Sequence, residues 1–218
     1  MKIDVSQALR YLGASGADEA TRRAMVQIAE DTAARLSPRY VYRVFDAAHT
    51  EEGVFLPEGN LLLPGKMAAT MLAGCSRAVL LCCTLGAAFD RMLGMAQARD
   101  MAKAAMLNAC GSAYVEAGCD EAQEEIAARY PSLYLTDRFS PGYGDLPLQL
   151  QPDLLNALNA EKRLGVTLTD TCLMLPAKSV TAVIGLSETP QPARIRGCGY
   201  CAMKGKCTYR ERGKHCGI

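Results

Sequence analysis

The sequence predicts an α+β domain in which a mainly antiparallel, twisted sheet packs against long helices. Three observations lead to this prediction. Helical and strand-like segments alternate irregularly, several strand candidates follow one another closely, and one helical pattern runs from Asp100 to Tyr130. Half of the 218 residues are hydrophobic, so the chain can bury one sizeable core. We expect one domain over residues 1–189 and a small cysteine-rich basic tail over residues 190–218.

The first half of the chain is predicted to mix helices with short strands. The amphipathic pattern of Ala17–Leu36 predicts a helix that ends at Ser37-Pro38, and the β-branched and aromatic Tyr40–Phe45 predicts a strand. A Pro-Glu-Gly-Asn turn between two apolar triplets predicts a hairpin. The further expected elements are hairpin strands at 54–56 and 61–63, a helix at 65–74, a buried strand at 77–83 and a helix from 86 to 95.

The second half is dominated by the long Ala-rich helix of 100–130. Gly111 and Gly118 lie inside it and each costs about 1 kcal/mol relative to Ala, so we expect another backbone to approach closely there. Pro131 ends this helix. After it we expect a helix at 152–164 with Gly165 as its C-cap, and strands at 166–168, 172–175 and 179–186.

The segment Arg138–Leu148 is the most informative part of the chain. It contains two prolines that fix φ and two glycines that permit tight turns or a close approach to a ligand. Arg138 offers a planar fork that matches a carboxylate, and Tyr143 offers a flat face with one hydroxyl. These groups suit a zwitterionic ligand that bears a heterocycle. The alternative is a surface loop with an incidental arginine.

This segment resembles the S-adenosylmethionine-binding signature Arg-x-x-x-Gly-Tyr of the reactivation domain of cobalamin-dependent methionine synthase. The signature reads here as Arg138, Gly142 and Tyr143. The resemblance continues through Glu161-Lys162-x-x-Gly165 and Met174-x-Pro176-x-x-Ser179-Val180, in the order and spacing of that family. It covers roughly residues 105–187.

The resemblance implies a ligand site. Arg138 would pair with the methionyl carboxylate of S-adenosylmethionine. Ser140, Gly142 and Tyr143 would line its adenosine and sulfonium, and Glu116 would contact it directly or through water. The structural alternatives remain open at this point: a surface ion pair for the arginine, a core position for the tyrosine and plain solvation for the glutamate. Asp145 departs from the family pattern and is expected to cap a turn.

The resemblance also implies an activity. Proteins of this family restore methylcobalamin from cob(II)alamin with an electron and the methyl group of S-adenosylmethionine, so this chain would belong to a methionine synthase (methyltransferase) system. The sequence contains no cobalamin-binding Asp-x-His-x-x-Gly motif. The corrinoid would therefore arrive on a partner, and the electron from a donor such as flavodoxin or ferredoxin. Alternatives are the reactivation of another corrinoid methyltransferase, and a non-catalytic S-adenosylmethionine-binding protein with a structural zinc tail.

The tail adds a cluster of thiols that the family pattern lacks. Four cysteines within the last 21 residues point to a metal site. An iron–sulfur cluster would be neutralised by the surrounding Lys and Arg and would supply a low-potential electron, while structural zinc and free thiols or disulfides are the alternatives. The expected ligands are Cys198, Cys201, Cys207 and Cys216. The other six cysteines lie in apolar contexts and are expected to be small buried hydrophobes.

The chain shows no targeting segment. Its first residues, Met-Lys-Ile-Asp-Val, lack the apolar core of a secretory signal, and the apolar run Ala78–Cys83 is far too short to cross a bilayer. We therefore expect a cytoplasmic protein, in which cysteines are mostly reduced, with neither a nucleic acid nor a membrane as its partner.

Overall fold

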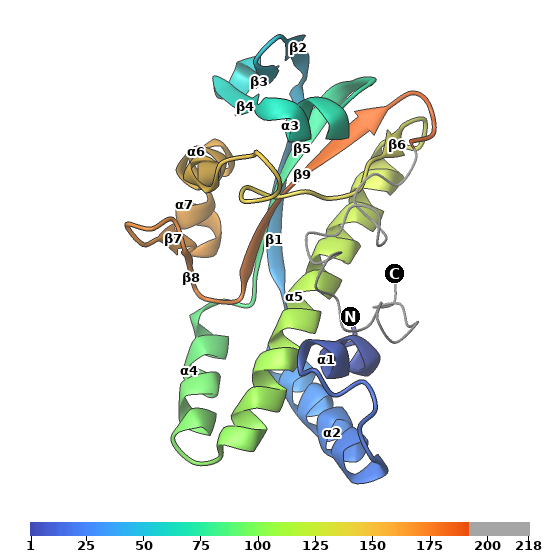
Figure 1. Ribbon diagram of the computed structural model, residues 1–218. Helices are drawn as coiled ribbons and strands as arrows, with labels where there is room; N and C mark the ends of the chain where they lie inside the picture. The colour runs from blue at the N-terminus through green and yellow to red at the C-terminus, as the bar shows by residue number, and fades with distance from the viewer. Residues whose placement is uncertain (192–218) are drawn as a thin grey trace.

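The structure is a computed structural model and describes residues 1–191. Its centre is a four-stranded antiparallel sheet with the strand order β1-β5-β9-β6. The two inner strands are long and pair over almost their whole length, which gives the sheet a rigid middle (Figure 1). The strands are β1 (Arg39–Asp46), β5 (Cys75–Thr84), β6 (Tyr134–Leu135) and β9 (Ser179–Ser187).

Both faces of this sheet are covered, because the inner strands are apolar on both sides. Alternate side chains of a strand point to opposite faces. On β5, Val79, Leu81 and Cys83 enter one hydrophobic cluster, while Leu80 and its neighbours Ala78 and Cys82 enter another. The domain is therefore a layered α+β structure with a core on each side of the sheet, and the predicted fold class is confirmed.

Helices cover the first face. They are α1 (Val5–Tyr11), α2 (Glu19–Arg35), α4 (Ala87–Gln97) and the 29-residue α5 (Met101–Arg129). The aspartates Asp4, Asp18 and Asp100 cap α1, α2 and α5 by accepting backbone N–H bonds. In Figure 1, α5 runs along the sheet, and α1, α2 and α4 gather around its N-terminal half. This arrangement carries the middle of α5 past the start of β9, where Lys178 donates to Ser112 (Figure 1).

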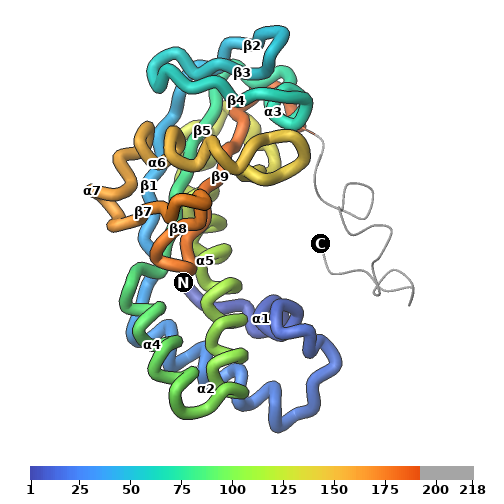
Figure 2. Tube along the Cα trace, turned by 60° about the vertical axis from the view of Figure 1, so that its left-hand side comes forward, coloured from blue at the N-terminus to red at the C-terminus, as the bar shows by residue number. Residues whose placement is uncertain are grey.

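The second face holds smaller elements (Figure 2). A three-stranded antiparallel sheet precedes α3. Two short helices and a two-stranded ribbon follow residues 137–148, which we call the motif loop. Their bounds are β2 (Ala48–Thr50), β3 (Gly53–Leu56), β4 (Leu61–Pro64), α3 (Gly65–Met71), α6 (Gln151–Leu158), α7 (Ala160–Leu164), β7 (Thr167–Leu168) and β8 (Met174–Leu175). Short 3-10 turns cover Pro57–Gly59 and Leu148–Leu150.

Several sequence predictions need correction. The helix expected at 152–164 is two helices, because Asn159 adopts a left-handed φ of 52° between α6 and α7. The strand expected at 172–175 keeps only two residues, since Cys172 has a φ of 62°. Gly111 and Gly118 make room for side chains rather than for a backbone: Phe89 lies against the first, and Pro38 with Cys83 lies against the second. The short α1, β2 and β6 were not anticipated.

The described cysteines behave largely as predicted. Five of the six are buried, Cys172 is partly exposed, and none of them forms a disulfide within residues 1–191. In that same range no cluster of three or more His, Cys, Asp or Glu side chains could hold a metal ion. The four cysteines of the predicted metal site lie outside the described residues, as does nearly all of the predicted tail.

Even the long α5 lacks the continuous apolar length that a bilayer requires, and so does every other described helix.

Candidate functional site

A cleft of about 500 Å³ opens beside the motif loop. Its walls come from distant parts of the chain: the end of α1, the middle of α5, residues 137–143 of the motif loop, the start of α6, β8 and the first half of β9. The motif residues Arg138, Ser140 and Tyr143 line it together with Glu116. The structure thus brings four of the five predicted ligand residues into one concave site.

The motif loop is anchored to the sheet by its first apolar residue. Phe139 is fully buried, and it exchanges two backbone bonds with Val183 of β9, N to O at 3.1 Å and O to N at 2.7 Å. Because neighbouring side chains of an extended segment point to opposite sides, Arg138 and Ser140 turn away from that core and toward the cleft. Ser140 also donates through Oγ to the Thr181 carbonyl at 2.7 Å.

A turn with positive φ closes the loop. Gly142 has a φ of 94°, and its N–H donates to the carbonyl of the buried Leu146 at 2.8 Å. Gly142 itself does not line the cleft, and its role in this structure is conformational. The turn leaves Tyr143 at the cleft rim with 49% of its surface exposed, so this tyrosine is not a core residue.

Asp145 fastens the far end of the loop to α3. Its carboxylate accepts the N–H groups of Lys66 at 2.7 Å and Met67 at 2.8 Å. These two bonds lower the pKa of Asp145, and the stabilisation they give is present at neutral pH and lost as the pH falls through the folded-state pKa. Gly65, with a φ of 90°, permits the close approach, because a Cβ there would lie 2.8 Å from the carboxylate. The expected turn cap is therefore the N-terminal cap of a helix 79 positions away.

Arg138 is the electrostatic centre of the cleft. Its guanidinium binds the Glu116 carboxylate at 2.9 Å and the Asp120 carboxylate at 2.7 Å, and it also donates to Gln123. These three partners stand one turn apart on α5 and share one helix face. The side chain of Arg138 is only 16% exposed. The ion pair that the sequence left as an alternative is thus present; its Glu116 partner lines the cleft, whereas Asp120 is 62% exposed and does not.

The acids outnumber the base at this site. Burial alone lowers the pKa of Arg138, but the hydrogen bond to Asp120 and the negative charges around it raise that pKa overall. Glu116 and Asp120 both pair with the single guanidinium of Arg138, so this group of three charges at the cleft is net negative. Such a site favours a ligand that is a net cation and also bears a group for arginine to bind.

Several cleft residues were not predicted from the sequence, among them Tyr11, Gln151 and Thr181. Tyr11 comes from α1 and is 51% exposed, and partial burial together with the charge of Glu116 raises its pKa. Gln151 starts α6 and accepts a 2.7 Å bond from the Thr181 hydroxyl inside the cleft wall. None of the three carries a local motif. The tyrosine in particular has no signal beyond being a single aromatic near the end of a seven-residue helix.

Lys178 lies beside the site rather than in it. Its ammonium donates to the Ser112 hydroxyl at 2.8 Å, and burial lowers its pKa. Ser179 begins β9, as expected, and also lines the cleft. Its hydroxyl is occupied by bonds to the Pro176 carbonyl at 2.7 Å and the Thr84 hydroxyl at 2.8 Å.

Comparison with known proteins identifies the family of this chain. The chain is similar in structure to the crystal structure of the MetH reactivation domain bound to AdoHcy, with a TM-score of 0.61, 15% identity, and coverage of 99% of this chain and 86% of that one. At this identity the likeness concerns the fold. No curated protein matches the sequence. Residues 86–200, more than half of the chain, match the family described as vitamin B12 dependent methionine synthase, activation domain. The chain therefore belongs to the activation-domain family of vitamin B12 dependent methionine synthase.

Proposed function

We propose that the protein binds S-adenosylmethionine in the Arg138 cleft and serves the reductive reactivation of a cobalamin-dependent methionine synthase. One observation carries the proposal: the motif residues Arg138 and Tyr143 meet Glu116 in a cleft with net negative charge. S-Adenosylmethionine has a sulfonium and an ammonium against one carboxylate, so it is a net cation. An acidic cleft with one arginine suits that charge pattern.

Within this proposal Arg138 and the acids of α5 contact different parts of the ligand. Arg138 binds the methionyl carboxylate, and Glu116 faces the cationic part of the ligand. Arg138 is already paired, so the ligand carboxylate has to share the guanidinium or displace a partner. Asp120 is the partner more easily displaced, because its side chain is 62% exposed against 30% for Glu116.

The residues of the cleft hold and orient the ligand but do not attack it. S-Adenosylmethionine supplies the methyl group, and the acceptor is the cobalt of a cobalamin carried by a partner chain. The cobalamin would approach from the open side of the cleft, where the half-exposed Tyr143 lies. The partner is a cobalamin-binding methionine synthase or a related corrinoid protein, and flavodoxin or ferredoxin is the proposed class of electron donor.

Calorimetric titration followed by a methylation assay tests this function. The isolated protein should bind S-adenosylmethionine, and with a reductant and a cob(II)alamin-loaded partner it should promote methylation of the cobalt. Without the partner it should leave its ligand intact. Steady release of S-adenosylhomocysteine by the protein alone would show an ordinary methyltransferase instead. Binding without methylation for every corrinoid partner would indicate a non-catalytic binding protein.

Tyr11 provides a separate prediction for the cleft. An aromatic face next to a sulfonium or an adenine contributes about 0.5–1.5 kcal/mol. Tyr11→Leu should therefore weaken S-adenosylmethionine binding about 2- to 12-fold, and Tyr11→Phe should retain most of the affinity. Tyr134→Leu is the matched control, since Tyr134 is 49% exposed but does not line the cleft. Equal affinities for the Leu and Phe variants would remove Tyr11 from the ligand site.

The tail is proposed to hold a metal centre that supplies the electron. The proposed ligands are Cys198, Cys201, Cys207 and Cys216, with an iron–sulfur cluster favoured over zinc. Truncation after Pro192 should then abolish cobalamin methylation while S-adenosylmethionine binding stays within about twofold. The visible spectrum of the intact protein should show the broad absorbance of a cluster, and that absorbance should disappear in the truncated chain. Unchanged methylation after truncation would contradict an electron-delivery role.

A further inference from the structure

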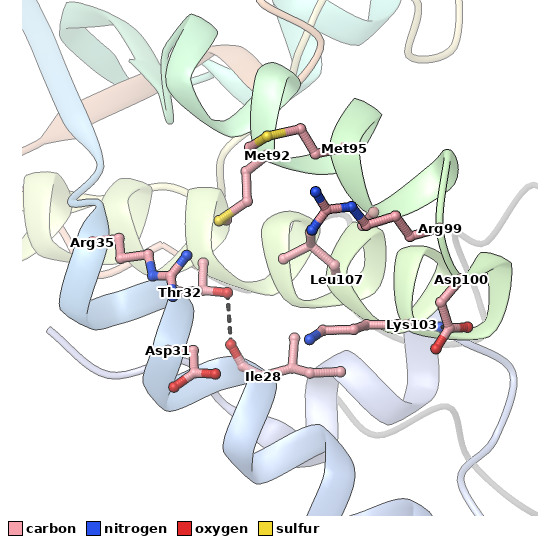
Figure 3. Close-up of a pocket in the computed structure, with 11 residues that line it drawn as sticks. Ile28, Asp31, Thr32, Arg35, Met92, Met95, Arg99, Asp100, Lys103 and Leu107 are labelled. Carbon is pink, nitrogen blue, oxygen red and sulfur yellow. Dashed lines mark hydrogen bonds between the residues drawn. The ribbon is translucent and has the colours of Figure 1, made fainter.

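A second cavity lies at the other end of α5, away from the cleft. It has a volume of about 420 Å³, is partly open to solvent, and is lined by α2, α4 and the first turns of α5 (Figure 3). This volume falls within the usual range of small-molecule sites. Its apolar lining includes Ile28 and Leu107 together with Met92 and Met95, whose flexible thioethers adapt to different ligand shapes.

Three cationic side chains converge on this apolar lining. Arg35 comes from the last turn of α2, Arg99 from the turn between α4 and α5, and Lys103 from the first turn of α5. Figure 3 shows Arg35 on one side of the cavity and Arg99 with Lys103 on the other, with their charged ends toward the space between them. Cations from two helices and from the turn between α4 and α5 are thus presented to one small volume.

Two acids, Asp31 and Asp100, also line the cavity, but their carboxylates accept hydrogen bonds from other groups. The carboxylate of Asp100 caps the N-terminus of α5, where it accepts two backbone N–H bonds of 3.0 Å. The carboxylate of Asp31 accepts a 3.1 Å bond from the Gln27 side chain. Within residues 1–191, no ion pair joins Arg35, Arg99 or Lys103 to a carboxylate.

The charge of the rest of the domain makes this cluster unusual. Residues 1–191 contain seventeen Lys and Arg and twenty-two Asp and Glu, a net charge of −5. The cavity lining has three cations against two acids, a net charge of +1, and is therefore a local exception in an acidic domain. Arg35, Arg99 and Lys103 are all exposed, so their charged ends are accessible to an anion that enters the cavity.

We propose that this cavity is a second ligand site that binds a small organic anion with an apolar body, of the carboxylate or phosphate monoester class. The anionic head pairs with Arg99 and Lys103 from one side and Arg35 from the other, while the apolar body lies against Met92 and Leu107. The site is separate from the Arg138 cleft, and the proposal does not rest on the function proposed for that cleft. Leu107 and Glu116 both belong to α5, and the rise per residue places them about 14 Å apart along its axis.

A matched set of naphthyl compounds tests this site. The probes are 1-naphthyl phosphate and 1-naphthaleneacetate, which are anionic, and neutral 1-naphthol. Binding is followed by the fluorescence of the naphthyl group as the full-length protein, which has no Trp, is added. Both anions should bind with a Kd below about 1 mM and at least about 10-fold more tightly than 1-naphthol. The better head group identifies the phosphate or the carboxylate source. Equal binding of 1-naphthol, or no binding of either anion at that concentration, would overturn the proposal.

Variants locate the binding. Arg99→Gln and Lys103→Gln should each weaken 1-naphthyl phosphate about 5- to 10-fold, and Met95→Gln should weaken it by a smaller factor. Arg91→Gln is the control, because Arg91 is an exposed cation of α4 that does not line the cavity. Arg138→Ala should leave the Kd unchanged. Loss of binding in that variant, or equal effects at Arg91 and Arg99, would show that the anion does not occupy this cavity. Association only with phosphatidylglycerol vesicles, and not with the free probes, would contradict a small-ligand site.

Discussion

Arg138→Ala should weaken S-adenosylmethionine binding about 30- to 1000-fold, a loss of about 2–4 kcal/mol. The substitution removes the charge-assisted partner of the ligand carboxylate. It also leaves Glu116 and Asp120 one turn apart on α5 without the cation between them, and like charges at this spacing repel. The structure therefore adds a second cost that the sequence did not suggest: the acids that face the ligand lose the group that orders them.

Calorimetry and thermal unfolding together separate these two costs. Arg138→Lys should recover only part of the affinity, because an ammonium cannot reproduce the fork that contacts both carboxylates. Arg163→Ala, at an exposed position of α7, is the control for loss of a cation. If Arg138→Ala keeps its fold and binds S-adenosylmethionine like the wild type, the ligand does not use this cleft.

The regular parts of the fold were predictable because their patterns are long. The amphipathic α2, the apolar β5 and the Ala-rich α5 each span enough residues for the period of the side chains to be read. Elements of two or three residues, such as β2 and β6, offer no period at all. The break between α6 and α7 was missed because the apolar pattern continues across Asn159, whose left-handed conformation leaves no trace in that pattern.

The candidate site shows the same contrast between residues that a local pattern reveals and residues that only the packing brings together. Arg138, Ser140 and Tyr143 are close in sequence and form a recognisable motif, and Glu116 follows from the family resemblance. The bond between Asp145 and α3 joins residues 79 positions apart, and Tyr11 reaches the cleft from more than a hundred residues away. Contacts of this kind depend on the packing of the whole domain, so no local pattern announces them. The pairing of Arg138 with three side chains of α5 also depends on this packing, and no local pattern predicts it.

Gly111→Ala should destabilise the domain, although alanine is the better helix former. Gly111 lies within α5, and a Cβ at that position would be 2.2 Å from the ring of Phe89, which is fully buried. Overpacking of this kind costs about 3 kcal/mol, while the gain in helix propensity offsets about 1 kcal/mol. The expected net loss of about 2 kcal/mol corresponds to a fall of about 4–8 °C in Tm for a domain of this size.

Gly94→Ala makes the comparison decisive, because it changes the same residue type inside the neighbouring helix. Gly94 lies in α4, and a Cβ there would meet nothing within 4 Å. This variant should gain about 1 kcal/mol and raise Tm by about 2–4 °C, so the two substitutions should move the melting curve in opposite directions.

Adding Phe89→Leu to Gly111→Ala should cost less than the two single losses combined, because the smaller side chain vacates the space that the new methyl needs. Additive losses, or a Gly111→Ala variant as stable as Gly94→Ala, would mean that α4 and α5 do not pack through this contact. The helical end of the domain, which forms the cavity of the proposed anion site, would then need a different arrangement.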